Sequence, residues 1–249
     1  MKSPIITIDG PVASGKGTVA RLLAEALGFH LLDSGSIYRA HALACLYRKL
    51  DFNEINSLEK QAKALSLKFV GEEIWLDGAN VSADVRSEAV GMAASTLSAI
   101  PQVRAALMQR QRDFAGSPGL VADGRDMGTV VFPTAQLKIY LTATAHVRAE
   151  RRAGQVAHQR VAAGETMAAK QLIEKGKSPT IRGLFETIRS QLQPDVEAQI
   201  RQRDSQDKSR EIAPLRAAFD AVVIDNAAHS PDETVAAILK LWQLRLSLN

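Results

Sequence analysis

The sequence predicts a three-layer α/β fold in which helices cover a five-stranded parallel sheet. The first observation is that short apolar runs alternate with helical patterns. The second is that glycine and polar residues directly follow these runs, as they do where parallel strands end at a ligand-binding edge. The third is that two stretches depart from the alternation. We therefore expect a core of residues 1–38, 119–147 and 211–249, an inserted small domain of antiparallel strands and helices at 39–118 (the insertion), and a helical lid at 148–210 (the lid).

The first strand, residues 5–8, leads into a glycine-rich turn, and a helical pattern follows at residues 19–27. This turn, the phosphate loop, comprises Gly10, Pro11, Val12, Ala13, Ser14, Gly15, Lys16, Gly17 and Thr18. Its glycines let backbone N–H groups point inward, the helix N-terminus adds partial positive charge, and Lys16 can reach the distal phosphates of a nucleotide. The alternative is a glycine-rich turn without a ligand, but the strand and helix on either side favour a nucleoside triphosphate site.

The second strand, residues 29–32, ends at Asp33-Ser34-Gly35. Ser36 is expected to cap the next helix, which runs towards residue 50. His30 lies within this strand, and we expect it to be a core or packing residue rather than a catalytic one.

The insertion shows a different pattern. A short helix precedes three strands at residues 67–70, 73–76 and 79–81, which the turn residues at 71–72 and 77–78 join into an antiparallel meander. Two helices are expected at 86–97 and 101–114, the second with Pro101 in its first turn.

The core resumes with strands at residues 119–123, 137–141 and 221–225, and a helix at 231–246 ends the pattern. Between residues 147 and 203 we find only polar helical stretches. Loops are expected within them at Gly154, at Gly164, at residues 176–179 and at Pro194.

Composition narrows the function classes. No apolar run approaches the ~18 residues of a membrane span, and Cys45 is the only cysteine, which favours a reducing compartment, by default the cytoplasm. The net charge of +4 comes from residues 148–211, where thirteen Lys or Arg stand against nine Asp or Glu. Such a confined excess suits a small polyanion rather than nucleic acid, although a solvated charged face explains most of these residues equally well.

Arginines at the expected ligand edge suggest a second phosphate ligand. Arg39 follows the second strand, and Arg125 with Asp126 follows the third core strand. A guanidinium binds two phosphate oxygens at once. An acceptor phosphate is mostly a dianion at pH 7, since its second pKa is about 6, so phosphoryl transfer to it needs positioning and charge neutralisation rather than a catalytic base.

The chain resembles the bacterial cytidylate kinases, a branch of the nucleoside monophosphate kinases. Besides residues 10–18, with Gly17 between Lys16 and Thr18, the resemblance rests on the following stretches: Asp33-Ser34-Gly35-Ser36-Ile37-Tyr38-Arg39, residues 123–133, Arg203-Asp204 and Lys208 with Arg210, and Ala213-Pro214. It implies a P-loop kinase core that transfers a phosphoryl group from ATP to CMP or dCMP with Mg²⁺ bound mainly by phosphates and water, working as a monomer with neither nucleic acid nor membrane as partner.

Transferred residue by residue, the resemblance implies roles at both substrates. Arg39, Arg125 and Arg210 would hold the acceptor phosphate close to Ser34, while Arg203 and Asp207 would contact the sugar. Ser95, Arg104 and Asp126 would read cytosine. The groups expected to act in the transfer itself are Lys16, Arg125, Arg151, Arg203 and Arg210.

Asp126 also has a physical reason to read the base, because a carboxylate accepts a hydrogen bond from the exocyclic amino group of cytosine but faces the carbonyl oxygen of uracil. Its alternative role is a structural carboxylate paired with Arg125. Ser95 and Arg104 could instead be surface residues of a helix.

Two further expectations concern the metal and the lid. Thr18 and Asp123 are placed to meet Mg²⁺ through water, and Asp123 could equally cap a helix. Arg148, Arg151 and Arg152 open the lid, and Arg151 is expected to touch the donor phosphates. Closure of the lid would exclude water and suppress hydrolysis of ATP.

Two features of this sequence differ from the pattern that the resemblance leads us to expect. The lid between residues 152 and 203 is longer, with an added stretch at 164–194 that we expect to be dispensable for chemistry. Gln206 occupies a position where an arginine is expected, so one contact with the donor phosphates is either missing or supplied by Lys208.

Rival functions stay open. The nearest is a UMP or AMP kinase with the same core, against which Asp126 and the inserted meander argue. A nucleotide-dependent switch is disfavoured because the chain has no Asn-Lys-x-Asp motif and because a second arginine cluster would then have no ligand.

Overall fold

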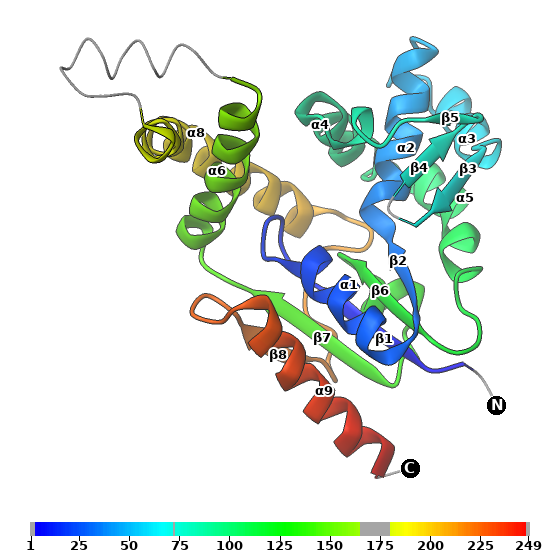
Figure 1. Cartoon of the computed structure of the whole chain (residues 1–249). Coiled ribbons are helices and arrows are strands. Elements are labelled where there is room, and N and C mark those ends of the chain that lie inside the picture. Colours follow the sequence, from blue (N-terminus) through cyan, green and yellow to red (C-terminus); the bar gives the residue numbers. More distant parts are fainter. Residues whose placement is uncertain (1–2, 72, 165–179, 248–249) are drawn as a thin grey trace.

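The computed structural model describes residues 3–71, 73–164 and 180–247. Its central sheet is parallel throughout and has the strand order β2-β6-β1-β7-β8, which confirms the predicted five strands. The bounds are β1 (Ile5–Asp9), β2 (His30–Asp33), β6 (Leu120–Gly124), β7 (Leu137–Thr142) and β8 (Val222–Asp225). Because all five strands run the same way, their carboxyl ends meet at one edge, where the phosphate loop follows β1 (Figure 1).

Alternate side chains of the strands face two separate apolar layers. On one face, Ile6, Ile8 and Val121 pack with residues of α1 (Lys16–Leu27) and α9 (Pro231–Ser247), which lie across the sheet in Figure 1. On the other face, Leu120 and Ala122 join the core beneath α2 (Ser34–Tyr47). Helices on both faces confirm the three-layer architecture.

The insertion follows β2 and contains a second, antiparallel sheet. Its strands are β3 (Leu67–Val70), β4 (Glu73–Leu76) and β5 (Ala79–Asn80), paired in that order. Around them lie α3 (Ile55–Lys63), a 3₁₀ turn (Asp84–Arg86), α4 (Glu88–Leu97) and α5 (Pro101–Arg112). The expected meander and the two helices after it are therefore present, with α4 beginning after a Ser87 cap.

The described residues of the lid form α6 (Ala145–Ala162) and α8 (Ile181–Ser209), which pack along each other through Ala157 and Ile188 (Figure 1). The break at Gly164 is confirmed, and residues 176–179 lie outside the described residues. The loops expected at Gly154 and Pro194 are wrong, because both residues lie inside helices. Helix propensity is a weak local preference that the packing of two long helices overrides.

Two local expectations at β2 are also corrected. Asp33 caps α2 instead of Ser36, since its carboxylate accepts the backbone N–H of Ser36 at 3.1 Å. His30 is exposed rather than buried, because β2 is an edge strand, and its Nε2 contacts the carbonyl oxygen of Ser117 at 2.8 Å. In the part of the chain that the structure describes, no helix combines the length and apolar character that a membrane span requires.

Candidate functional site

The phosphate loop joins the buried end of β1 to the N-terminus of α1. Gly15 forms the N-cap of α1 with φ 88° and makes no side-chain capping bond, so the first N–H groups of the helix are not capped by a side chain. Ala13 also has a positive φ, 59°. These conformations produce the tight turn that an anion site at a helix N-terminus needs.

Three carbonyl oxygens of the phosphate loop are each held by a side chain. Lys16 Nζ donates to the Pro11 oxygen at 2.8 Å, and Arg148 Nη1 donates to the Val12 oxygen at 2.9 Å. Asn226 Nδ2, from the end of β8, donates to the Ser14 oxygen at 2.9 Å. The loop is thus fixed by its own lysine, by the lid and by the far strand of the sheet.

Gly10 is the position in the loop where a side chain has least room. A Cβ built there would lie 2.0 Å from the backbone oxygen of Leu141, and φ is 153°. We expect Gly10→Ala to lower the free energy of unfolding by about 3 kcal/mol or more, since backbone cannot yield as a side chain can. Urea denaturation followed by circular dichroism measures this change.

Gly28→Ala is the matched control. Gly28 has φ 64°, but nothing lies within 4 Å of the position that a Cβ would take there, so this variant reports the cost of the backbone conformation alone. Equal losses for the two variants would contradict the proposed clash at Gly10.

Two buried carboxyl groups, those of Asp9 and Asp123, lie beside the phosphate loop. Asp9 accepts the backbone N–H groups of Met127 and Gly128 at 2.8 and 2.7 Å, and burial raises its pKa to about 6. Burial likewise raises the pKa of Asp123, whereas it lowers the pKa of Lys16, to which the positive charge of Arg125 also contributes. The three groups share one desolvated site at the ends of β1 and β6.

The arginines predicted to contact the acceptor phosphate and its sugar meet in two groups. Arg125 Nε donates to Asp207 at 3.0 Å, and Arg210 donates to the other oxygen of the same carboxylate and to Ser98 Oγ at 2.9 Å. The second group is at Gly91. Arg203 donates to its carbonyl oxygen at 3.2 Å, and a Cβ on Gly91 would lie 2.8 Å from Arg39 Nη2.

Desolvation is the largest cause that lowers the pKa of Arg39, and the nearby positive charge of Arg203 is the second. Arg39 is held by the carbonyl oxygens of Val85 and Ser87. Ser34, close to the same edge, donates to the Asp123 carbonyl oxygen at 2.8 Å. The predicted acceptor residues therefore lie in two groups, one at Asp207 and one at Gly91.

Among the predicted base readers, Asp126 and Arg104 form a buried ion pair. Their side chains have exposed fractions of only 5% and 4%. Asp126 thus pairs with Arg104 rather than with Arg125, and its role in reading the base stays a prediction. A surface position for Arg104 is wrong, since its guanidinium lies 5.7 Å from the ring centre of Tyr38. Ser95 is half-buried, and its Oγ donates to Gln206 Oε1 at 3.4 Å.

The three arginines at the start of the lid have different partners. Arg148 is buried and binds both oxygens of Asp204 on α8. Arg151 donates to the side chain and carbonyl oxygen of Asn226 at 3.2 and 2.7 Å. Arg152 lies 3.6 Å from Glu88 of the insertion. The lid therefore contacts both the core and the insertion.

Gln206 and Lys208, the two residues considered for the missing contact with the donor phosphates, have different surroundings. Gln206 faces Ser95 of the insertion, and Lys208 is exposed. The role of Lys208 towards donor phosphates stays a prediction.

Sequence reasoning missed Asp9, Asp204 and Asn226 as site residues. Asp9 and Asn226 each lie at or just after the carboxyl end of a parallel strand. The same edge rule that selected Asp123 would have found them.

The described residues contain no cluster of three or more His, Cys, Asp or Glu side chains that could hold a metal ion. Oδ1 of Asp123 is nevertheless among the buried side-chain oxygens that have no hydrogen-bond partner. Gly17, beside Thr18, is close to this carboxylate, since a Cβ there would lie 3.5 Å from Asp123 Oδ2. This donor set fits Mg²⁺ coordinated mostly by phosphates and water, with one carboxylate near it.

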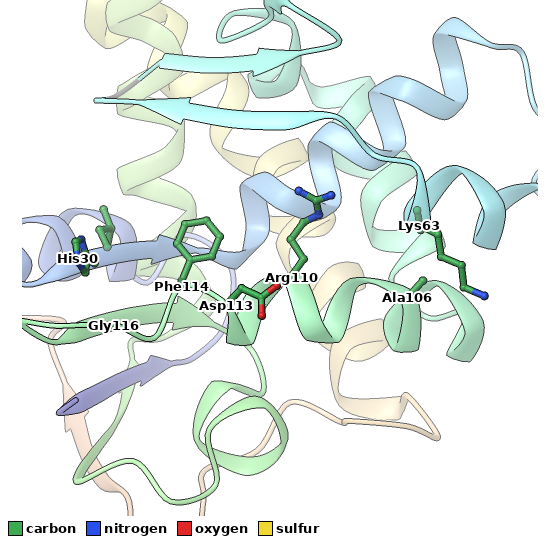
Figure 2. A pocket seen from close by; sticks show the side chains of 9 residues that line it. His30, Lys63, Ala106, Arg110, Asp113, Phe114 and Gly116 are labelled. Atoms are coloured by element: carbon green, nitrogen blue, oxygen red, sulfur yellow. The ribbon is translucent and has the colours of Figure 1, made fainter. Parts of the chain in front are cut away.

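A cavity of about 720 Å³ lies elsewhere, between the edge strand β2 and the insertion helices α3 and α5. Figure 2 shows its lining, which includes His30, Lys63, Arg110 and Phe114. None of its lining residues is a predicted site residue, and Arg110 Nη2 is already bonded to the Leu65 carbonyl oxygen at 2.6 Å. The phosphate loop, rather than this cavity, therefore defines the candidate site.

Comparison with known proteins gives one family. The family model described as cytidylate kinase matches residues 6–179 and 184–244. Three curated proteins named cytidylate kinase align with nearly the whole chain. That of Ralstonia pickettii is 48% identical over 243 residues, covering 98% of this chain and 93% of the relative. That of Bordetella bronchiseptica is 44% identical (97% and 96% covered), and that of Aliivibrio salmonicida is 44% identical (98% and 98% covered).

These alignments correct one expectation. The lid is not an enlargement peculiar to this chain, because the relatives align along almost their full lengths and the family model matches through residue 179. The first half of α8, within the stretch that we expected to be an addition, also continues without a break into the motif that carries Arg203 and Asp207. On the extent and identity of these matches, the chain belongs to the cytidylate kinase family.

Proposed function

We propose that the protein transfers the terminal phosphoryl group of ATP to CMP or dCMP, giving ADP and CDP or dCDP. The observation that supports this most is the presence, besides the phosphate loop, of two arginine groups, Arg125 with Arg210 at Asp207 and Arg39 with Arg203 at Gly91. One phosphate site accounts for a nucleotide binder, whereas two call for a reaction between two phosphate ligands.

On the donor side, the N–H groups of the phosphate loop bind the phosphates of ATP, and Lys16 leaves the Pro11 oxygen to contact the transferred group. Asp123 and Thr18 would hold Mg²⁺ through water, and the bound ion would neutralise charge on the donor oxygens. Arg151 approaches the same phosphates from the lid.

On the acceptor side, the phosphate of CMP competes with Asp207 for Arg125 and Arg210. A carboxylate that pairs the two guanidinium groups in the free protein keeps their charges from repelling each other. Arg39 and Arg203 complete the anion site from α2 and α8, and Arg203 with Asp207 lies towards the sugar.

No general base is required, since an acceptor phosphate with a second pKa of about 6 is mostly ionised at pH 7. The arginines stabilise the charge that spreads over the transferred group, and the two sites hold donor and acceptor in line. Closure of α6 and α8 over the site excludes water as a competing acceptor.

The base is read by the buried pair of Asp126 and Arg104, with Ser95 on α4 as a third contact. Arg104 holds the carboxylate of Asp126 in one orientation, which then accepts from the amino group of cytosine. UMP would place the carbonyl oxygen of uracil, an acceptor, against this buried carboxylate, which is the physical basis of discrimination against uracil.

A coupled ADP-release assay with Mg-ATP and each of CMP, dCMP, UMP and AMP tests the proposal. We expect strong turnover with the two cytidine nucleotides only. Equal turnover with all four, or turnover with none, would contradict it. A monomeric state and a cytoplasmic location stay predictions, and sedimentation of the purified chain tests the first.

A further inference from the structure

We infer that Asn226 is a positioning residue for ATP, which acts by holding one peptide group of the phosphate loop in the orientation that binds phosphate. The inference rests on the proposed function, and it goes further by naming a residue outside the loop, the acceptor site and the lid. Three hydrogen bonds of Asn226 and the geometry of one peptide bond support this role.

Asn226 lies immediately after β8 and is buried, with 4% of its surface exposed. Its backbone N–H donates to the Thr142 carbonyl oxygen at 3.0 Å, which joins it to the end of β7. Both polar atoms of its side-chain amide form hydrogen bonds. Nδ2 donates to the Ser14 carbonyl oxygen at 2.9 Å, and Oδ1 accepts from Arg151 Nη1 at 3.2 Å. A residue so placed has little freedom to move.

The two partners decide which end of the amide faces which neighbour. A guanidinium has only donors, and a backbone carbonyl is only an acceptor, so the oxygen must face Arg151 and the nitrogen must face Ser14. Arg151 thus fixes the direction of the amide, and the amide fixes the Ser14 carbonyl. An aspartate of the same shape would place an acceptor against that carbonyl.

Holding the Ser14 carbonyl also orients the next N–H group. In a trans peptide the carbonyl of Ser14 and the N–H of Gly15 point in opposite directions within one plane. The Gly15 N–H therefore points away from Asn226, at the N-cap of α1, where the loop is open to an anion. Gly15 has φ 88° and no Cβ, so without this bond the peptide could rotate more freely than at other positions of the loop.

The test compares Asn226→Asp with the wild type by calorimetry, with a non-hydrolysable ATP analogue in the presence of Mg²⁺ in one series and CMP in the other. We expect the dissociation constant for the ATP analogue to rise at least 10-fold, with less than a 2-fold change for CMP. In steady-state assays KM for ATP rises in the same way while KM for CMP is unchanged. A merely structural role would weaken both ligands together.

Asn53→Asp is the matched control, because Asn53 Nδ2 also donates to an acceptor oxygen, that of Asp51, at an exposed position in the insertion. It should leave both affinities unchanged. If Asn226→Asp does not fold, Asn226→Ala replaces it, since this variant removes the bond without adding a charge. Unaltered affinity for the ATP analogue, or an equal loss for both ligands, would overturn the inference.

The two series also separate this inference from the proposed function. A wild-type protein that binds the ATP analogue but not CMP would contradict the proposed acceptor. The ATP series would still decide the role of Asn226.

Discussion

Replacing Lys16 with methionine is expected to lower kcat for phosphoryl transfer by about 10³-fold while the protein stays folded. Lys16 is buried, and its Nζ lies 2.8 Å from the Pro11 oxygen and 3.4 Å from Ser14 Oγ, at the point where the donor phosphates are expected. Methionine retains the length of the aliphatic stem but removes the charge that moves with the transferred group. Single-turnover measurements at saturating ATP and CMP give the change directly.

Lys138→Met is the control for this experiment. Lys138 is also buried, and its Nζ also donates to a backbone carbonyl, that of Pro133 at 2.7 Å, besides pairing with Asp220. It lies outside the proposed site, so this variant should lose stability without losing kcat. A Lys16→Met protein with wild-type kcat would refute the role assigned to the lysine.

The second large effect is expected at Asp126. We predict that Asp126→Asn reduces the ratio of kcat/KM for CMP to that for UMP by about 10²- to 10³-fold, because the amide can donate to the carbonyl oxygen of uracil where the carboxylate could not. The same assay with CMP and UMP at several concentrations measures both constants.

The effect of Asp126→Asn on the stability of the protein must be separated from its effect on the choice between CMP and UMP. Asp126→Asn deprives Arg104 of its carboxylate in a buried position, and loss of one partner of a buried ion pair typically costs about 3–5 kcal/mol. The double variant Asp126→Asn with Arg104→Met removes the unpaired charge as well, so it tests whether the altered preference survives when the buried charge is gone. A CMP-to-UMP ratio that stays within twofold of wild type in both folded variants would argue against base reading by Asp126.

Much of the fold could be predicted because its signals are local. Each core strand is an apolar run of a few residues, and each lies within about a residue or two of its expected bounds. The errors occurred where a local rule met a long-range contact. Pro194 and Gly154 indicate loops by propensity, yet the packing of α6 on α8 keeps both within helices.

The same division holds at the candidate site. Residues 10–18 could be recognised as a phosphate loop because the strand, the glycines, the lysine and the helix are contiguous. The resemblance assigned the arginines that we expect at the acceptor to motifs of known spacing. The partner of Asp126 could not be chosen in this way. Its neighbour Arg125 is the nearer residue in the chain, but Arg104, 22 positions away, is the one that pairs with it.

By itself, then, the sequence determined the class of fold, the phosphate loop and some of the charged residues at the sheet edge, since each depends on the backbone preferences and apolar pattern of a few neighbouring residues. Only the tertiary structure decided which of those charges meet, and which residues support the loop. Asn226 lies 212 positions from Ser14, and Arg148 lies 136 from Val12, yet both reach its carbonyl groups. Such contacts arise because parallel strands bring their carboxyl ends to one edge whatever their separation in the chain, and no local pattern records which side chains then face each other.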